Sequence, residues 1–134
     1  MKDDQYYLKK AVKLSDAKKP RFNFAALIVK DGKIIAADTE HVYDHHDPSA
    51  HDGISALRSA GKKAGDWRLE GCTMYCSDEP CVMCFCCAAW AGIERIVYAR
   101  PKPVKHGYEF NGVSLEDLAA SLQRPMKVQR ISLE

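Results

Sequence analysis

The arrangement of hydrophobic and polar residues along the chain predicts alternating helices and strands. In the first eighteen residues, apolar side chains recur at helical spacing after an aspartate cap, and Pro20 ends this helix. Residues 24–37 form two apolar runs on either side of an Asp-Gly pair, which is the pattern of a β-hairpin. A polar loop is expected over residues 39–49.

In the second half of the chain, helical and strand patterns alternate, and this order favours parallel strands. The expected strands cover residues 24–29, 34–37, 72–77 and 95–100, and residues 127–131 form either an edge strand or an extended tail. The expected helices cover residues 3–18, 50–64, 80–90 and 114–122. We therefore predict an α/β fold in one domain, residues 1–134: a three-layer α/β/α sandwich around a mixed five-stranded sheet.

Composition and charge limit the classes of protein to which the chain can belong. Hydrophobic residues make up 46% and charged residues 28% of the sequence, as in ordinary globular domains. The net charge of +2 does not indicate nucleic acid as a partner, and no basic run is interleaved with aromatic residues. No segment is apolar and long enough to span a membrane, and the N-terminal residues lack the apolar core of a signal peptide. We expect a cytoplasmic protein.

The six cysteines are crowded into one segment, from Cys72 to Cys87. A secreted domain held by disulfides would spread its cysteines along the chain, so this crowding indicates a metal site in a reducing compartment. Four of the six, together with a nearby tryptophan, are expected to fill the core. These residues are Cys72, Cys76, Cys86, Cys87 and Trp90.

Cys81 and Cys84 are spaced so that they can share a metal ion. They stand at i and i+3 at the start of a predicted helix, where both sulfurs lie on one face and the helix dipole favours the thiolate form. His51 stands 30 residues before Cys81, at the start of another predicted helix. A redox pair of cysteines would not need this histidine. One histidine and two cysteines leave the fourth position of a zinc ion open for water, which is typical of catalytic Zn²⁺ sites.

Three segments carry a family resemblance: "PSAH" at 48–51, "EPCVMC" at 79–84 and "WAGI" at 90–93. They resemble the zinc-dependent cytidine/deoxycytidylate deaminase superfamily, whose signature is H-x-E followed by P-C-x-x-C. Residues 106–125 look most like guanine deaminases. The resemblance implies a cytidine deaminase-like fold, a Zn²⁺ cofactor held by His51, Cys81 and Cys84, and a homodimer. In such relatives the C-terminal segment, here about 104–134, is often exchanged between subunits.

The sequence departs from this family at the residue that moves protons. The family has a glutamate two residues after the histidine, and this chain has Gly53 there. General acid–base catalysis contributes about 10²–10⁴-fold to a reaction rate, so an active enzyme would need another residue to replace the missing glutamate. Glu40 stands 11 residues before His51, where the family usually has an asparagine that holds the substrate. It is either a relocated general base or a solvated loop residue, and Asp52 is the second candidate.

Two functional interpretations follow from these departures. In the first, the protein is a zinc-dependent aminohydrolase that acts on a purine or purine-like base or nucleoside, with Glu40 or Asp52 as the proton shuttle. Asn23, Phe24, Glu40 and Tyr108 are then candidates for binding a small heterocyclic amine. In the second, the protein is a catalytically inactive deaminase-like zinc protein that serves as a binding or partner subunit. Nucleic acid is the less expected partner in either case.

Overall fold

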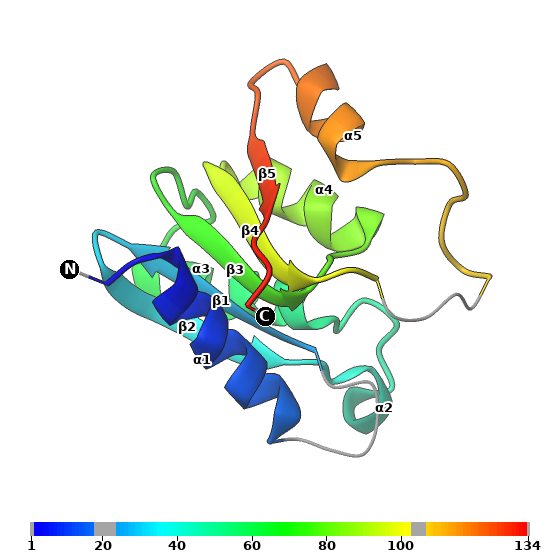
Figure 1. The fold of residues 1–134 in the computed structure, drawn as a ribbon. Helices are drawn as coiled ribbons and strands as arrows, with labels where there is room; N and C mark the ends of the chain where they lie inside the picture. The colour runs from blue at the N-terminus through cyan, green and yellow to red at the C-terminus, as the bar shows by residue number, and fades with distance from the viewer. Residues whose placement is uncertain (1, 18–23, 103–106, 134) are drawn as a thin grey trace.

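The computed structural model describes residues 2–17, 24–102 and 107–133, and Figure 1 shows a sheet with helices on both faces. The helices are α1 (Asp4–Asp16), α2 (Val42–His45), α3 (Asp52–Ala64), α4 (Val82–Ala91) and α5 (Leu115–Ser121). The strands are β1 (Ala25–Lys30), β2 (Lys33–Thr39), β3 (Thr73–Asp78), β4 (Arg95–Arg100) and β5 (Lys127–Arg130). The predicted α/β architecture is confirmed. None of the helices in the described ranges is long and apolar enough to cross a membrane.

The sheet is mixed, as predicted, and its strands follow the order β2-β1-β3-β4-β5. β1 is antiparallel to both of its neighbours, β2 and β3. β3, β4 and β5 are parallel, because helices α4 and α5 supply the crossovers that parallel neighbours require. The ends of β2, β3 and β4 therefore lie at the same edge of the sheet as the start of β1.

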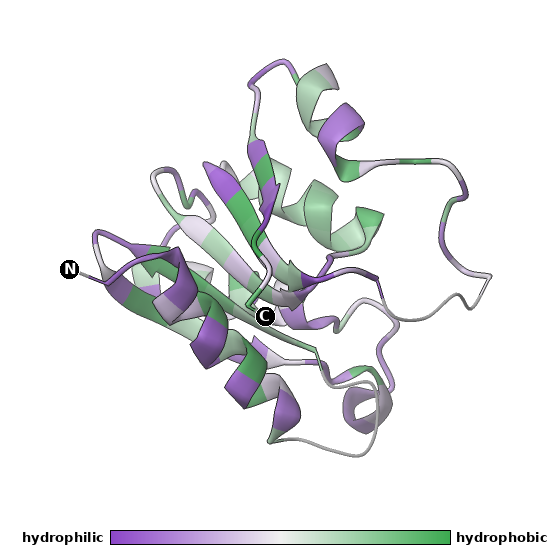
Figure 2. Ribbon diagram, in the orientation of Figure 1, coloured by the Kyte–Doolittle hydropathy of each residue, from purple (hydrophilic) through white to green (hydrophobic). Residues whose placement is uncertain are grey.

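Helix α1 covers one face of the sheet. The Asp3 carboxylate accepts the N–H of Tyr6 at 3.0 Å and caps the helix, as predicted. Tyr7, Leu8 and Ala11 recur at helical spacing and are at most 3% exposed, because they pack on β1, β3 and β4. Figure 2 shows the opposite, hydrophilic side of α1 turned away from the sheet.

Helices α3 and α4 cover the other face and enclose the larger core. Leu57 of α3 and Phe85 of α4 are buried with Ile28, Met74 and Ile96 of the sheet. Burying one side chain of this size stabilises the fold by about 1.5–3 kcal/mol. This packing fixes the two helices beside each other, with their N-terminal ends at the same edge of the sheet.

The structure corrects the predictions in two places. Helix α2 lies within residues 39–49, where a loop without regular structure was expected. Trp90 is 80% exposed and Cys86 is also exposed, so neither fills the core. The buried side of α4 is instead formed by Cys84, Phe85, Ala88 and Ala91. Since α4 is apolar on nearly all sides, its sequence could not show which side faces the sheet.

Candidate active site

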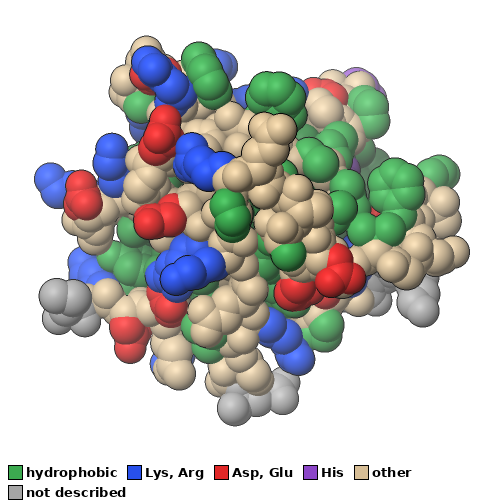
Figure 3. All heavy atoms as spheres, turned by 90° about the horizontal axis from the view of Figure 1, so that it is seen from above, with side chains coloured by type: hydrophobic (Ala, Val, Ile, Leu, Met, Phe, Trp, Pro, Cys, Tyr) green, Lys and Arg blue, Asp and Glu red, His purple; other side chains and the backbone are tan. Residues whose placement is uncertain are grey.

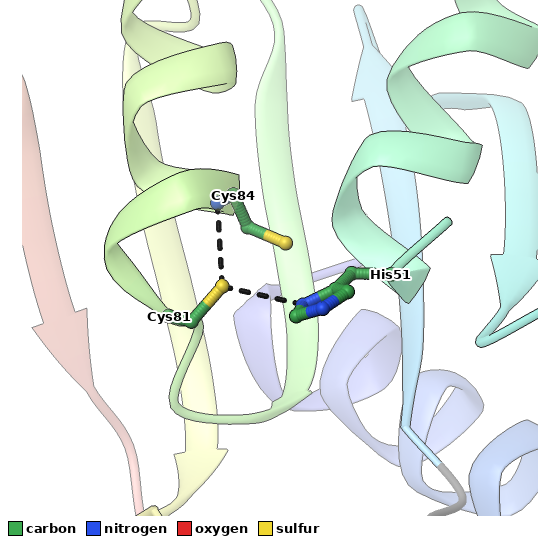
Figure 4. Close-up of side chains that lie close together, drawn as sticks. All are labelled: His51, Cys81 and Cys84. Atoms are coloured by element: carbon green, nitrogen blue, oxygen red, sulfur yellow. Dashed lines mark hydrogen bonds between the residues drawn. The ribbon is translucent and has the colours of Figure 1, made fainter. Parts of the chain in front are cut away.

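Three side chains that can bind zinc meet at the N-terminal ends of α3 and α4. His51 and Cys81 are the N-cap residues of these helices, and Cys84 lies in the first turn of α4. Their ligand atoms all lie within 4.8 Å of one another, and Figure 4 shows the three side chains pointing together. The Sγ of Cys81 lies 3.3 Å from Nδ1 of His51 and accepts the N–H of Cys84 at 3.4 Å. This histidine and two cysteines fit a zinc ion.

The surroundings of Cys81 favour its thiolate form. Hydrogen bonds from the Cys84 thiol, the His51 ring and the Cys84 amide outweigh burial and lower the pKa of Cys81 to about 4. The same thiol–thiol hydrogen bond, together with burial, raises the pKa of Cys84. The hydrogen bond with Cys81 raises the pKa of His51. Because the thiolate is the form that binds metal, the lowered pKa of Cys81 favours metal binding by this group.

The three donors open into a cavity of about 710 Å³ at the edge where β3 and β4 end. Small-molecule sites commonly have volumes of about 300–1,000 Å³. In α/β sheets, ligands usually bind in the crevice outside the carboxyl ends of the parallel strands. Besides the three donors, the wall includes Phe24, Glu40, Val42, Tyr43, Asp52, Met83, Lys102, Tyr108 and Glu109.

Both carboxylates predicted to move protons line this cavity. Glu40 follows β2, and its Oε1 accepts the N–H of Val42 at the start of α2. Asp52 begins α3, directly after His51, and burial raises the pKa of Asp52 to about 7. The negative charges of Asp52 and Glu40 add to the rise in the pKa of His51. Their catalytic roles remain predictions.

Gly53 lies where α3 approaches the second cysteine of the cluster. A Cβ placed on Gly53 would be 3.1 Å from both Cβ and Sγ of Cys84, and 3.7 Å from Cε of Met74. Position 53 therefore faces the zinc-site cysteine. The glutamate of the family signature would stand there, and this chain supplies no carboxylate from that direction.

The structure places two of the three remaining predicted substrate residues at the cavity. Phe24 is half-buried in its wall, and the carbonyl of Phe24 accepts the N–H of Glu40 at 3.2 Å. Tyr108 lines the cavity of its own chain, although its side chain is 92% exposed. Asn23 lies outside the described residues. Contact between these residues and a substrate stays a prediction.

Several wall residues were missed by reasoning from the sequence. Val42 and Tyr43 belong to α2, and their only signal was an apolar pair inside a polar run. Lys102 and Glu109 carry no local signal, because the fold brings them together. The Nζ of Lys102 lies 3.1 Å from Oε1 of Glu109, so the two opposite charges form an ion pair at the wall.

Comparison with known proteins places the chain in a family. The family described as "Cytidine and deoxycytidylate deaminase zinc-binding region" matches residues 1–100. The chain belongs to this family. Among its relatives, guanine deaminase of Bacillus subtilis (strain 168) is 43% identical over 76 residues, which are 57% of this chain and 49% of that protein. The tRNA-specific adenosine deaminase of Aquifex aeolicus (strain VF5) is 35% identical over 107 residues, covering 77% of this chain and 69% of that protein.

Solved structures of deaminases share the fold along most of the chain. Guanine deaminase from Bacillus subtilis superposes with a TM-score of 0.70 and 31% identity, covering 89% of this chain and 90% of that one. A structure from studies of A-to-I editing by tRNA:A34 deaminases gives a TM-score of 0.78 at 27% identity, covering 93% and 91%. The predicted family resemblance and its Zn²⁺ cofactor are confirmed. In sequence, the chain spans about half the length of the Bacillus guanine deaminase.

Proposed function

We propose that the protein is a zinc-dependent aminohydrolase that removes an amino group from a purine or purine-like base or nucleoside. The observation that carries this proposal is the group of His51, Cys81 and Cys84, which opens into a cavity that also holds two carboxylates. Zinc with three protein ligands has an open position and acts as a Lewis acid that makes water nucleophilic near neutral pH.

The carboxylates of the chain account for the proton transfers of this reaction. Water adds to the ring carbon that bears the amino group, the carbon–nitrogen bond breaks, and the products are a ring carbonyl and ammonia. We assign Glu40 to accept the proton of the attacking water and to return protons to the ring nitrogen and the departing amine. Asp52, beside His51, is the alternative shuttle. The Val42 N–H bond to Glu40 Oε1 holds the Glu40 carboxylate in the wall.

The cavity and the relatives together support a purine-like ring as the substrate. The Bacillus and Aquifex relatives are by name a guanine deaminase and a tRNA-specific adenosine deaminase, so both act on a purine. Phe24 supplies an aromatic face that can stack on a flat ring. An ionised carboxylate such as Glu40 only accepts hydrogen bonds, so it favours rings that present N–H donors, as guanine, pterins and aminotriazines do.

Ammonia release by the zinc-loaded protein tests the proposal. The panel comprises guanine, adenine, cytosine, their nucleosides, pterins, aminotriazines and a tRNA anticodon stem-loop. We expect ammonia from at least one small purine-like compound, and a matching change in its ultraviolet spectrum. Zinc-free protein is the control. No release from any compound, with one equivalent of zinc bound, would contradict the proposal.

Gly53 supports a second candidate function, that of an inactive partner subunit. Position 53 faces the zinc-site cysteine, yet it carries no side chain that could move a proton. In this alternative the zinc group stabilises the fold, and the cavity binds a ligand or a partner without turnover. The ammonia assay separates the two candidates, because only the first predicts a product.

We also propose that the protein is a homodimer, in which α4 packs on a second copy. Met83, Cys86 and Trp90 are the exposed side chains of α4 and follow one another at helical spacing, and Trp90 is 80% exposed. Figure 3 shows the face seen from above, where hydrophobic side chains lie among polar and charged ones and are more frequent on its right side. Met83 also lines the cavity, so a second copy here would lie beside the site. Exchange of residues 104–134 between the two copies remains a prediction.

Replacing Trp90 by aspartate is expected to convert the dimer to a monomer, because a buried unpaired charge would oppose association. The measurement is molar mass by light scattering after gel filtration. Trp67→Asp is the matched control, since Trp67 is also exposed, at 68%, but lies outside α4. A monomeric wild-type protein, or a dimer that survives Trp90→Asp, would contradict the interface.

The six free cysteines suit a reducing compartment, which supports the cytoplasm as the location of the protein.

A further inference from the structure

Helix α2 carries a second group of side chains with metal-binding chemistry. We propose that His41, Asp44 and His45 form a separate site for a divalent transition-metal ion such as zinc. The site shares no residue with the group of His51, Cys81 and Cys84. It stands on the segment that also supplies Glu40, Val42 and Tyr43 to the cavity wall.

The distances within the group suit a small metal ion. One ligand atom from each of the three side chains lies within 4.8 Å of the other two. Nδ1 of His41 lies 2.9 Å from Oδ2 of Asp44, and Nε2 of His45 lies 3.9 Å from the same oxygen. Zinc–nitrogen bonds of about 2.0–2.1 Å place two ligand atoms of a tetrahedral site roughly 3.3 Å apart. Small side-chain rotations are therefore enough to centre an ion.

The two histidines are arranged as a chelating pair. They stand at i and i+4, the spacing that brings two imidazoles to one side of a helix and binds zinc in other proteins. Their rings are stacked, with centroids 4.8 Å apart and planes only 10° from parallel. Because parallel rings do not aim their lone pairs at one point, the exposed His45 ring would have to turn to share an ion with His41 and Asp44, and solvent leaves it room to do so.

Asp38 accepts the hydrogen bond that a metal-binding histidine usually donates from its other ring nitrogen. Oδ1 of Asp38 lies 2.7 Å from Nε2 of His41, so this nitrogen donates its proton to the carboxylate and Nδ1 is the nitrogen that faces Asp44. A carboxylate on the far nitrogen orients the ring and makes the near nitrogen a better ligand.

The ion would tie α2 to the end of β2. A helix of four residues has too few internal hydrogen bonds to be stable by itself. A metal held by His41, Asp44 and His45, with Asp38 of β2 behind it, would fix this turn. Val42 lies inside the turn, and its N–H is the group that holds Glu40. The second site would therefore order one wall of the cavity without contacting the substrate.

Calorimetric titration tests the site. Protein carrying one equivalent of zinc is freed of excess metal by gel filtration and titrated with Zn²⁺. We expect a second, weaker equivalent in the wild-type protein. His45→Gln should weaken this second binding at least tenfold, because it removes a ligand, and Asp38→Asn should weaken it about 10–100-fold through the ring of His41. The first equivalent should remain in both variants.

His46→Asn is the matched control, because His46 is an exposed neighbour outside the group, and asparagine tolerates its left-handed backbone at φ 51°. This variant should bind the second equivalent as the wild-type protein does. Three results would overturn the site: no second equivalent in the wild-type protein, a second equivalent unchanged in His45→Gln, or an equal loss in His46→Asn. Since the assay follows metal and not ammonia, it is independent of the proposed activity.

Discussion

Glutamine in place of Glu40 is expected to lower kcat/KM by about 10²–10⁴-fold while the protein keeps its zinc, because general acid–base catalysis has this magnitude. Glutamine has the same shape and retains a carbonyl oxygen, so it can still accept the N–H of Val42 and preserve α2. It cannot take a proton from water near neutral pH. The measurement is the rate of ammonia release on the best substrate of the panel, with zinc content determined in the same preparation.

Asp52→Asn is the variant that distinguishes the two candidate shuttles. If Glu40 moves the protons, Asp52→Asn should change the rate much less than Glu40→Gln does. Glu116→Gln is the neutral control, because Glu116 is exposed on α5 and does not line the cavity. Normal turnover by Glu40→Gln would refute the relocated base, and a loss confined to Asp52→Asn would transfer the role to Asp52.

Serine in place of Cys81 is expected to abolish both zinc binding and turnover. The Cys81 sulfur lies at the centre of the group, hydrogen-bonded to the His51 ring and to the amide of Cys84. A serine hydroxyl in its place would stay protonated and bind zinc poorly. When free zinc exceeds its dissociation constant 100- to 1,000-fold, the bound ion adds about 3–4 kcal/mol to the free energy of unfolding. For a domain of this size, the loss should lower Tm by about 10 °C.

The measurement is zinc content after gel filtration, together with thermal unfolding with and without a chelator. The chelator should lower the Tm of the wild-type protein and leave that of Cys81→Ser unchanged. Cys86→Ser is the matched control, because Cys86 belongs to the same helix but is exposed and outside the zinc group. A full equivalent of zinc in Cys81→Ser, or a wild-type Tm that the chelator does not change, would contradict the assignment of Cys81 as a zinc ligand.

The fold was largely predictable because most elements have one buried side. The period of apolar residues reports burial directly in α1, where Tyr7 and Leu8 face the sheet and the neighbouring lysines face water. That signal fails for α4, which is apolar all round, so Trp90 and Cys86 were wrongly expected in the core. It also fails for α2, since four residues are too few to show a period.

By itself, the sequence pointed to the zinc group through the spacing of its residues at helix starts, and to the missing glutamate through the family resemblance. His51, Cys81 and Cys84 could be chosen, and Gly53 noticed, without knowing where α3 and α4 pack. Only the tertiary structure decided that Glu40 reaches the same cavity as Asp52. Glu40 follows β2, and the antiparallel pairing of β1 with β2 and β3 is what brings it to the end of β3. Such long-range pairing depends on the packing of the whole sheet, which no local pattern records.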